Sequence, residues 1–147
     1  MKLTLRPTIV VDADGLILGR MSSKIAKRLL NGESILIVNA EKAVISGRKR
    51  SKVIEAKTFL EVGGVGRGPF HQRKPDRIVR KTIKGMLPHR NPKGLQAYKR
   101  LRVFIGMPEA LKDQKPETVP EAQAQKLKCP YFSVGEFAKE IGWNQGA

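Results

Sequence analysis

Lysine and arginine side chains, the groups that bind phosphate, are concentrated in one part of this sequence. Between Arg67 and Arg102 there are twelve Lys or Arg residues and a single acid, Asp76, so this segment carries +11 of the formal net charge of +16. One arginine guanidinium group can bind two phosphate oxygens at once, and several such contacts make binding strongly salt-dependent. Because the segment is basic and also contains apolar repeats, it predicts a folded surface for a polyanion.

The candidate RNA-binding residues are cations of this segment, a second basic cluster that precedes it, and one histidine. They are Arg48, Lys49, Arg50, Arg67, Arg73, Lys74, Arg80, Lys84, His89, Arg90, Lys93, Lys99 and Arg100. Aromatic residues make up only 5% of the chain, which disfavours modules that stack bases on a sheet. The composition therefore predicts recognition of folded RNA through its shape and backbone.

The glycine-rich stretch before this segment does not match a nucleotide-binding motif. Gly63 and Gly68 stand at the Walker A spacing, but Pro69 and Phe70 follow where Lys and Ser or Thr are required. The dinucleotide fingerprint fails as well, because Pro69 occupies the position of its third glycine. We expect no nucleotide cofactor and no small-molecule substrate.

Residue types that could support catalysis are scarce. His71 and His89 lie among cations without a Ser-His or Cys-His signature, and the best acidic pair, Asp12 and Asp14, is interpreted as turn and cap residues. The one cysteine, Cys129, excludes an internal disulfide and a zinc site built on several thiolates. It is expected to be buried or half-buried. We predict no catalytic residue, no metal ion and no enzymatic activity.

The first part of the chain has the pattern of a βαβ unit. Thr8–Val11 and Ser34–Val38 are short apolar runs typical of strands, and Leu18–Leu30 has apolar residues at helical spacing. Asn39 is expected to cap a short helix over Ala40–Ile45. This order predicts parallel strands joined by right-handed crossovers.

The basic segment continues the pattern with helices. Pro75–Met86 is predicted to be an amphipathic helix with Pro75 in its first turn and with Ile78, Val79, Ile83 and Met86 facing inward. A short helix near Leu95–Arg100 and a strand Leu101–Ile105 should follow. Together these elements predict an α/β fold: a three-layer α/β/α arrangement with a small, mainly parallel central sheet and Rossmann-like topology.

Between these units the pattern is weaker. Ser46–Arg50 interrupts it with a basic cluster, and Val53–Leu60 could extend as a helix but has mixed periodicity. Leu60–Lys74, which contains four glycines, is expected to be a loop. Ser133 and Glu136 have the spacing of a capping box and predict a final helix.

The chain is expected to form a single domain over residues 1–147. Residues 107–147 form a near-neutral extension with six acids and five bases, predicted to pack against the sheet or a neighbouring protein. Its candidate anchors are Tyr131, Phe132, Phe137 and Trp143, with burial in the core favoured for the first three. No apolar run approaches the ~20 residues that span a bilayer, and the start lacks a signal-peptide pattern. We therefore expect a cytoplasmic protein without membrane contact.

Three blocks of the sequence resemble a known family. DADGLILGRMSSKIAKRLLNGE, ILIVNAEKAVISG and GPFHQRKPDRIVRKTIKGMLPHRNPKGLQAYKRLRVFIGMPE occur in this order and resemble the L-thirteen family of large-subunit ribosomal proteins, most closely its archaeal members. The resemblance implies an α/β domain that binds large-subunit rRNA early in assembly and remains as a structural component beside other ribosomal proteins. It also implies that Gly85–Pro88 lies against RNA.

Two alternatives remain at this point. One is a small RNA-modifying or nucleotide-handling enzyme on a Rossmann-like sheet, with Asp12 and Asp14 after the first strand as its acidic groups. The other is a regulatory RNA binder that acts outside the ribosome. The structural ribosomal role is the principal hypothesis.

Overall fold

Three parallel strands form the central sheet of the computed structural model, which describes residues 8–144 and 146. The strands are β1 (Thr8–Asp12), β2 (Ser34–Val38) and β4 (Leu101–Val103), in the spatial order β1-β2-β4. The central strand β2 is buried from Ile35 to Val38, as its continuous apolar sequence predicts. The predicted parallel βαβ beginning is confirmed.

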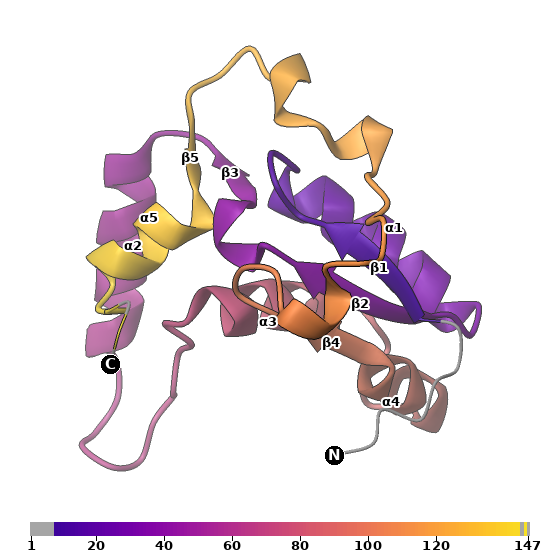
Figure 1. The fold of residues 1–147 in the computed structure, drawn as a ribbon. Helices are drawn as coiled ribbons and strands as arrows, with labels where there is room; N and C mark the ends of the chain where they lie inside the picture. The colour runs from indigo at the N-terminus through magenta and orange to yellow at the C-terminus, as the bar shows by residue number, and fades with distance from the viewer. Residues whose placement is uncertain (1–7, 145, 147) are drawn as a thin grey trace.

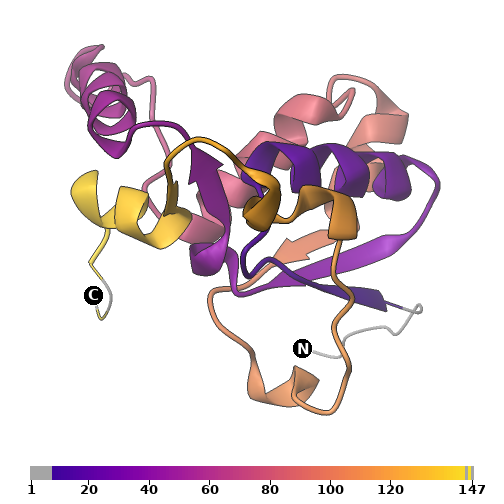
Figure 2. The ribbon, with the colours of Figure 1, turned by 90° about the horizontal axis from the view of Figure 1, so that it is seen from above.

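Three helices cover one face of this sheet (Figures 1 and 2): α1 (Leu18–Leu30), α3 (Pro75–Met86) and α4 (Pro92–Lys99). The bounds of α1 and α3 agree with the predicted ones. Apolar side chains from these helices and from the sheet form the main core. Its largest fully buried members include Met21, Ile25, Leu29, Ile35, Ile37, Val79, Ile83 and Leu101.

The opposite face of the sheet is covered by the chain that follows β4 (Figure 2). Phe104, Met107 and Leu111 pack against the buried side chains of Val10, Leu36 and Val38. This segment contains one short 3-10 helix, η2 (Glu109–Leu111). The predicted α/β class with a small, mainly parallel sheet is confirmed, and the layer on this face is a loop with a single 3-10 turn.

The extension then runs back along β1. The Glu117 N–H donates to the Val10 carbonyl (2.8 Å), and the Asp12 N–H donates to the Glu117 carbonyl (3.0 Å). Two 3-10 helices, η3 (Pro120–Ala122) and η4 (Ala124–Lys126), follow. Part of the predicted packing surface therefore lies against the sheet edge. A hydrogen bond from Lys24 on α1, together with the positive charge of that side chain, lowers the pKa of the Glu121 carboxyl.

A two-stranded antiparallel ribbon replaces the helix predicted over residues 40–45. Only the 3-10 helix η1 (Ala40–Lys42) forms, and β3 (Val44–Ser46) then pairs with β5 (Tyr131–Ser133). Asn39 adopts φ 54° and does not cap η1; its side-chain amide donates to Asp12 Oδ1 (2.9 Å). The helix prediction was wrong because the partner strand lies far along the chain, where local periodicity carries no information about it.

Two further helices flank the ribbon (Figure 1): α2 (Lys49–Glu61) and α5 (Val134–Glu140). The Ser46–Arg50 cluster is thus not only a break in the pattern, because α2 begins inside it. The predicted cap of the final helix is confirmed, since Ser133 Oγ accepts a hydrogen bond from the Glu136 N–H (3.1 Å).

Removing that cap should weaken the protein measurably. We expect Ser133→Ala to lower the free energy of unfolding by about 1 kcal/mol, because one N–H of the first turn of α5 loses its acceptor. Urea denaturation followed by circular dichroism measures the change. Ser51→Ala, at an exposed helical position of α2, is the matched control and should not destabilise the chain. Equal unfolding midpoints for both variants would argue against the cap.

Residues predicted as anchors in the extension divide between core and surface. Phe132 and Trp143 are buried and Phe137 is half-buried, whereas Tyr131 is 54% exposed. Burial of Tyr131 was a wrong expectation, because neighbouring residues of a strand point to opposite faces and Phe132 takes the core side of β5. Cys129 is exposed, which also corrects the prediction. It lies on the surface connection that leads into β5.

Residues 1–7, 145 and 147, the ends of the predicted domain, lie outside the described residues. Within residues 8–144 and 146, no helix combines the length and apolar character needed to cross a membrane.

Candidate nucleic-acid interface

The outer face of α3 is a row of cations on a rigid support. Val79 and Ile83 are fully buried against the sheet, so the side chains on the opposite side of the helix face outward. These are Arg77, Arg80, Lys81 and Lys84, all of which are exposed. Met86 does not face inward as predicted; its side chain is 42% exposed, because it lies in the last turn, where α3 leaves the sheet.

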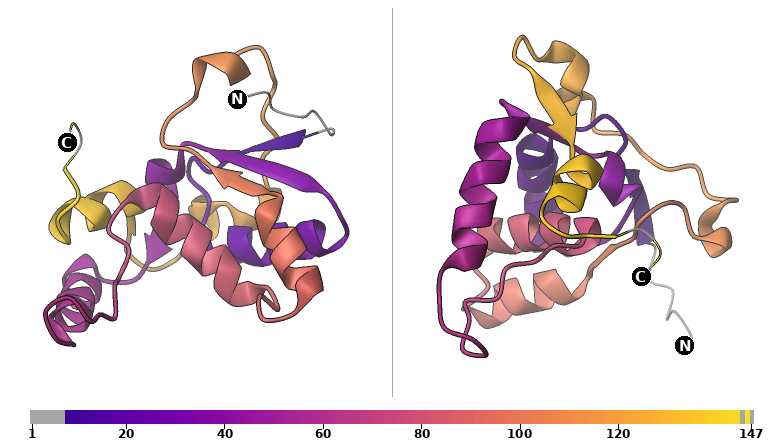
Figure 3. Two further views of the ribbon diagram at one scale, coloured as in Figure 1. Left: turned by 90° about the horizontal axis from the view of Figure 1, so that it is seen from below. Right: turned by 90° about the vertical axis from the view of Figure 1, so that its left-hand side faces the viewer.

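A short turn joins α3 to α4 and extends the basic surface. Leu87 is buried, and its carbonyl accepts a hydrogen bond from the His89 N–H (2.7 Å). Arg90 and Lys93, which follow, are exposed. Figure 3 (left) shows α4 following α3 through this short turn, with the loop from α2 entering α3 at its other end. We call the exposed cations of α3, this turn and α4, together with the half-buried His89 of the turn, the basic face.

The charges of this face are not neutralised within the protein. Of the thirteen candidate RNA-binding residues, Lys49 is the one that forms an ion pair with an acid in residues 8–144 and 146. The ion pairs of the described chain otherwise involve Lys24, Arg28, Lys42 and Lys52, which lie on other elements. The basic face therefore presents cations without internal counterions.

A hollow of about 610 Å³ lies between α3 and α4. Its walls combine cations with an aromatic ring, an imidazole and an amide. They are formed by Gln72, Arg77, Arg80, Lys81, Lys84, Gly85, His89 and Tyr98. Arg80 Cζ lies 4.6 Å, and Lys84 Nζ 5.7 Å, from the centroid of the Tyr98 ring. We call this the α3–α4 hollow.

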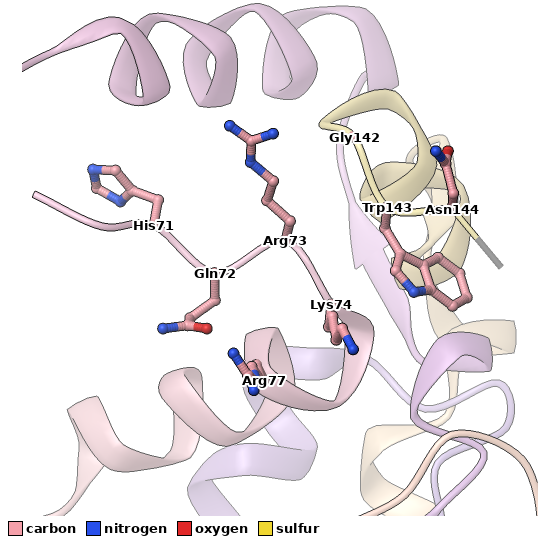
Figure 4. A pocket seen from close by; sticks show the side chains of 8 residues that line it. All are labelled: His71, Gln72, Arg73, Lys74, Arg77, Gly142, Trp143 and Asn144. Carbon is pink, nitrogen blue, oxygen red and sulfur yellow. The ribbon is translucent and has the colours of Figure 1, made fainter. Parts of the chain in front are cut away.

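A second hollow, of about 360 Å³, forms where the loop before α3 meets the end of the chain (Figure 4). It is lined by His71, Gln72, Arg73, Lys74, Arg77, Gly142, Trp143 and Asn144. Gly142 has φ 102°, and a Cβ there would lie 3.0 Å from Arg73 Nη1. The near-neutral extension thus contributes side chains next to the basic segment, which the sequence did not indicate.

Comparison with known proteins identifies the family. The model of the family "Ribosomal protein L13" matches residues 6–110. The chain belongs to the L-thirteen family of ribosomal proteins.

Curated relatives agree over nearly the full length. The Archaeoglobus fulgidus protein named "Large ribosomal subunit protein uL13" is 46% identical over 91% of this chain and 87% of its own. The Methanosarcina barkeri protein of the same name is 44% identical, covering 90% of this chain and 96% of its own. The Thermoplasma acidophilum protein is 41% identical, with 90% and 97% covered. The expected resemblance to archaeal members is confirmed.

Asp12 and Asp14 have structural contacts in this L-thirteen family member. Asp12 Oδ1 accepts hydrogen bonds from the Asp14 N–H (3.0 Å) and from the Asn39 amide, and Asp14 lies 3.7 Å from Lys42 Nζ. Their interpretation as turn residues is confirmed, but neither side chain caps the helix that follows, since Ile17 is the N-cap of α1. Within residues 8–144 and 146, no group of three or more His, Cys, Asp or Glu side chains is placed to hold a metal ion.

Other candidate residues lie outside the basic face. Arg48 and Arg50 are exposed at the start of α2, while Lys49 Nζ lies 3.6 Å from Glu136 and 3.4 Å from Glu140 on α5. The sequence did not indicate that Lys49 joins two helices. Arg77 and Lys81 were missed as candidates, although the helical periodicity that places Arg80 and Lys84 on the surface also places them there.

The loop from α2 to α3 carries the remaining candidates, and its tip depends on glycine. Gly64 and Gly68 pair as an isolated antiparallel bridge, and a Cβ on Gly63 would meet the Gly68 carbonyl oxygen at 2.2 Å. Arg67 is exposed at this tip, while Arg73 and Lys74 are exposed close to α3. The loop therefore separates Arg67 from the cations of the basic face.

Arg100 has a structural contact. Its Nη2 donates to the Leu29 carbonyl in the last turn of α1 (2.7 Å), and the side chain is half-buried. This guanidinium satisfies a carbonyl at the helix C-terminus, where positive charge is favourable.

Arg100→Met is therefore expected to lower the free energy of unfolding by about 1.5 kcal/mol, because a charged hydrogen bond to a part-buried carbonyl is lost. Arg100→Met should reduce the affinity for RNA less than Lys99→Met does, because the neighbouring Lys99 side chain is exposed. Thermal unfolding and RNA filter binding of both variants give the two readouts. A stable Arg100→Met protein with reduced RNA affinity would assign Arg100 to RNA instead.

Proposed function

We propose that this protein is a structural constituent of the large ribosomal subunit that binds large-subunit rRNA through the basic face. The observation that carries the proposal is a set of exposed cations without internal counterions, held on helices that are docked to the sheet by buried apolar side chains. Cations on a backbone that is already fixed lose less conformational freedom when they bind phosphate. The counterions that RNA releases on binding add to the affinity. The curated relatives are named as proteins of the large ribosomal subunit.

The rRNA-binding residues that we propose fall into three groups. The basic face supplies most of them, the loop 62–74 supplies a second group, and the start of α2 supplies the third. They are Arg77, Arg80, Lys81, Lys84, His89, Arg90, Lys93 and Lys99; Arg67, Arg73 and Lys74; and Arg48 and Arg50. We further propose that residues 1–147 form one domain, with 107–147 packing on the sheet and beside neighbouring ribosomal proteins.

Binding early in assembly and residence in the cytoplasm are parts of the same proposal. The family membership supports both. Pulse-labelled ribosomal precursors, separated on sucrose gradients, should contain the protein in their lightest large-subunit fractions. Appearance only in mature subunits would contradict early binding.

The contacts of the two acidic residues after β1 support a structural role and not a catalytic one. Asp12 and Asp14, the acidic pair that an enzyme on this sheet would use, are engaged in the turn after β1 and with Lys42. No contact of the described residues favours catalysis over this role, so we propose no enzymatic activity.

Stoichiometry in the ribosome tests the proposal directly. Quantitative mass spectrometry of sucrose-gradient fractions from cells that produce the protein should give about one copy per large subunit. A free pool with no large-subunit peak would overturn the structural role and favour a regulatory RNA binder outside the ribosome.

A further inference from the structure

The α3–α4 hollow contains groups that binding to an RNA backbone does not require. Arg77, Lys81 and Lys84 supply charge for phosphate, but Gln72 and His89 bring an amide and an imidazole to the same space. Amide and imidazole groups form directional hydrogen bonds with neutral donors and acceptors. Their position among cations indicates a ligand with both a charged and a neutral polar part.

A planar surface also lies in this hollow. Arg80 Cζ lies 4.6 Å from the centroid of the half-buried Tyr98 ring, close enough for a cation–π contact that holds the guanidinium in place. Unpaired RNA bases stack both on aromatic rings and on arginine guanidinium planes. Arg80 and Tyr98 therefore offer a platform for a base.

The hollow is open and has room for a ligand of this kind. Its volume of about 610 Å³ falls within the ~300–1,000 Å³ of small-molecule sites. Gly85 lines it, and a Cβ added there would meet no atom within 4 Å, so the space beside α3 is not filled by protein. Of the described residues, no Asp or Glu lines the hollow to repel a phosphate.

We infer that the α3–α4 hollow receives one unstacked nucleotide of the bound RNA. Its phosphate lies on Arg77, Lys81 and Lys84, its base stacks on Arg80 over Tyr98, and Gln72 and His89 hydrogen-bond the edge of the base. The inference rests on the proposed rRNA binding and adds base recognition to it. The second hollow, which Figure 4 shows, lacks a comparable platform, because the ring of Trp143 is buried.

Chemical probing of large-subunit rRNA with the full-length protein tests this site. Reagents that modify the Watson–Crick edges of bases are used in parallel with hydroxyl radicals, which report on the backbone. The wild-type protein should protect one isolated base within a stretch of protected backbone. The double variant Gln72→Ala/His89→Ala should restore reactivity of that base while the backbone stays protected.

Stacking is tested on Tyr98. Tyr98→Leu should weaken RNA binding about tenfold, because the ring holds the Arg80 guanidinium on which the base stacks, and loss of one base-stacking contact has an effect of this size. Tyr98→Phe, which keeps the ring, should bind like the wild type. Replacing the protected nucleotide by an abasic one should produce the same loss for the wild type and no further loss for Tyr98→Leu. Circular dichroism of each variant checks that the fold is retained.

The outcomes separate the two proposals. Backbone protection without a protected base would overturn the nucleotide site and leave rRNA binding intact. Absence of both kinds of protection would overturn rRNA binding itself. Free 5′-mononucleotides are added at millimolar concentration as competitors. If they displace the protected base and bind the protein as tightly as the RNA does, the hollow is a site for small nucleotides and the assignment to RNA is wrong.

Discussion

Reversing four charges on the basic face, as Arg80→Glu, Lys84→Glu, Arg90→Glu and Lys93→Glu in one chain, is expected to abolish association with large-subunit rRNA. All four side chains are exposed, and none forms an ion pair with an acid in the described part of the chain. The logarithm of the affinity falls as the logarithm of the salt concentration rises, and each lost phosphate contact makes this slope shallower by about 0.7–0.9. The slope should fall by about three, and the affinity more than a thousandfold, since glutamates also repel the backbone.

A control with the same change in charge separates placement from net charge. Replacing Lys112, Lys115, Lys126 and Lys128 by Glu also lowers the formal net charge from +16 to +8, but these exposed residues lie on the extension. Filter binding over a range of salt concentrations, together with co-sedimentation with large subunits, should show that this control retains specific binding. Unchanged co-sedimentation of the basic-face variant, or an equal loss of RNA affinity in both variants, would contradict the assignment of the basic face to rRNA binding.

The elements that were predictable from sequence are those whose stability is encoded locally. α3 begins at Pro75, whose fixed φ suits the first turn, and its buried residues Val79 and Ile83 stand four positions apart on one face. β2 is apolar from Ile35 to Val38 and lies in the centre of the sheet. Within these elements the sequence pattern and the burial of side chains agree.

The elements that were not predictable depend on distant parts of the chain. β3 exists because β5 pairs with it, and no local signal in Val44–Ser46 identifies Tyr131–Ser133 as the partner. α2 has one buried residue, Val53, while Ile54 and Phe59 are more than half exposed. Its apolar residues therefore do not follow the helical period that a sequence pattern detects. The possible helix over Val53–Leu60 is confirmed, but its true bounds were not predicted.

The same distinction applies to the candidate site. Exposure of Arg80 and Lys84 follows from the period of α3, but the approach of Tyr98 to these cations depends on how α4 packs beside α3. Likewise, Gly142 meets Arg73 only because α5 ends beside the loop before α3. The charged surface follows from the local periodicity of α3, whereas tertiary packing determines where its hollows lie.

Packing of the α3–α4 turn leads to the second large effect, at Gly94. Gly94 is buried inside α4, and a Cβ there would lie 2.0 Å from the Pro88 carbonyl oxygen and 2.4 Å from its carbon. The clash involves backbone atoms that cannot rotate away, so either α4 or the turn has to move. We expect Gly94→Ala to lower the free energy of unfolding by about 3 kcal/mol, at the upper end of the usual cost of overpacking. Urea denaturation measures it.

Gly19→Ala is the matched control, because it is also a glycine inside a helix, α1, but a Cβ there meets no atom within 4 Å. Alanine should stabilise that helix by up to about 1 kcal/mol. The two variants should also differ in RNA binding. The turn that contacts Gly94 orients His89, Arg90 and Lys93, so its displacement moves three groups of the basic face together, whereas a Cβ on Gly19 meets no atom within 4 Å and displaces none of them. If Gly94→Ala is as stable as Gly19→Ala, the turn moves without a loss of folding free energy. The close packing of α4 on Pro88 would then not be what positions these groups.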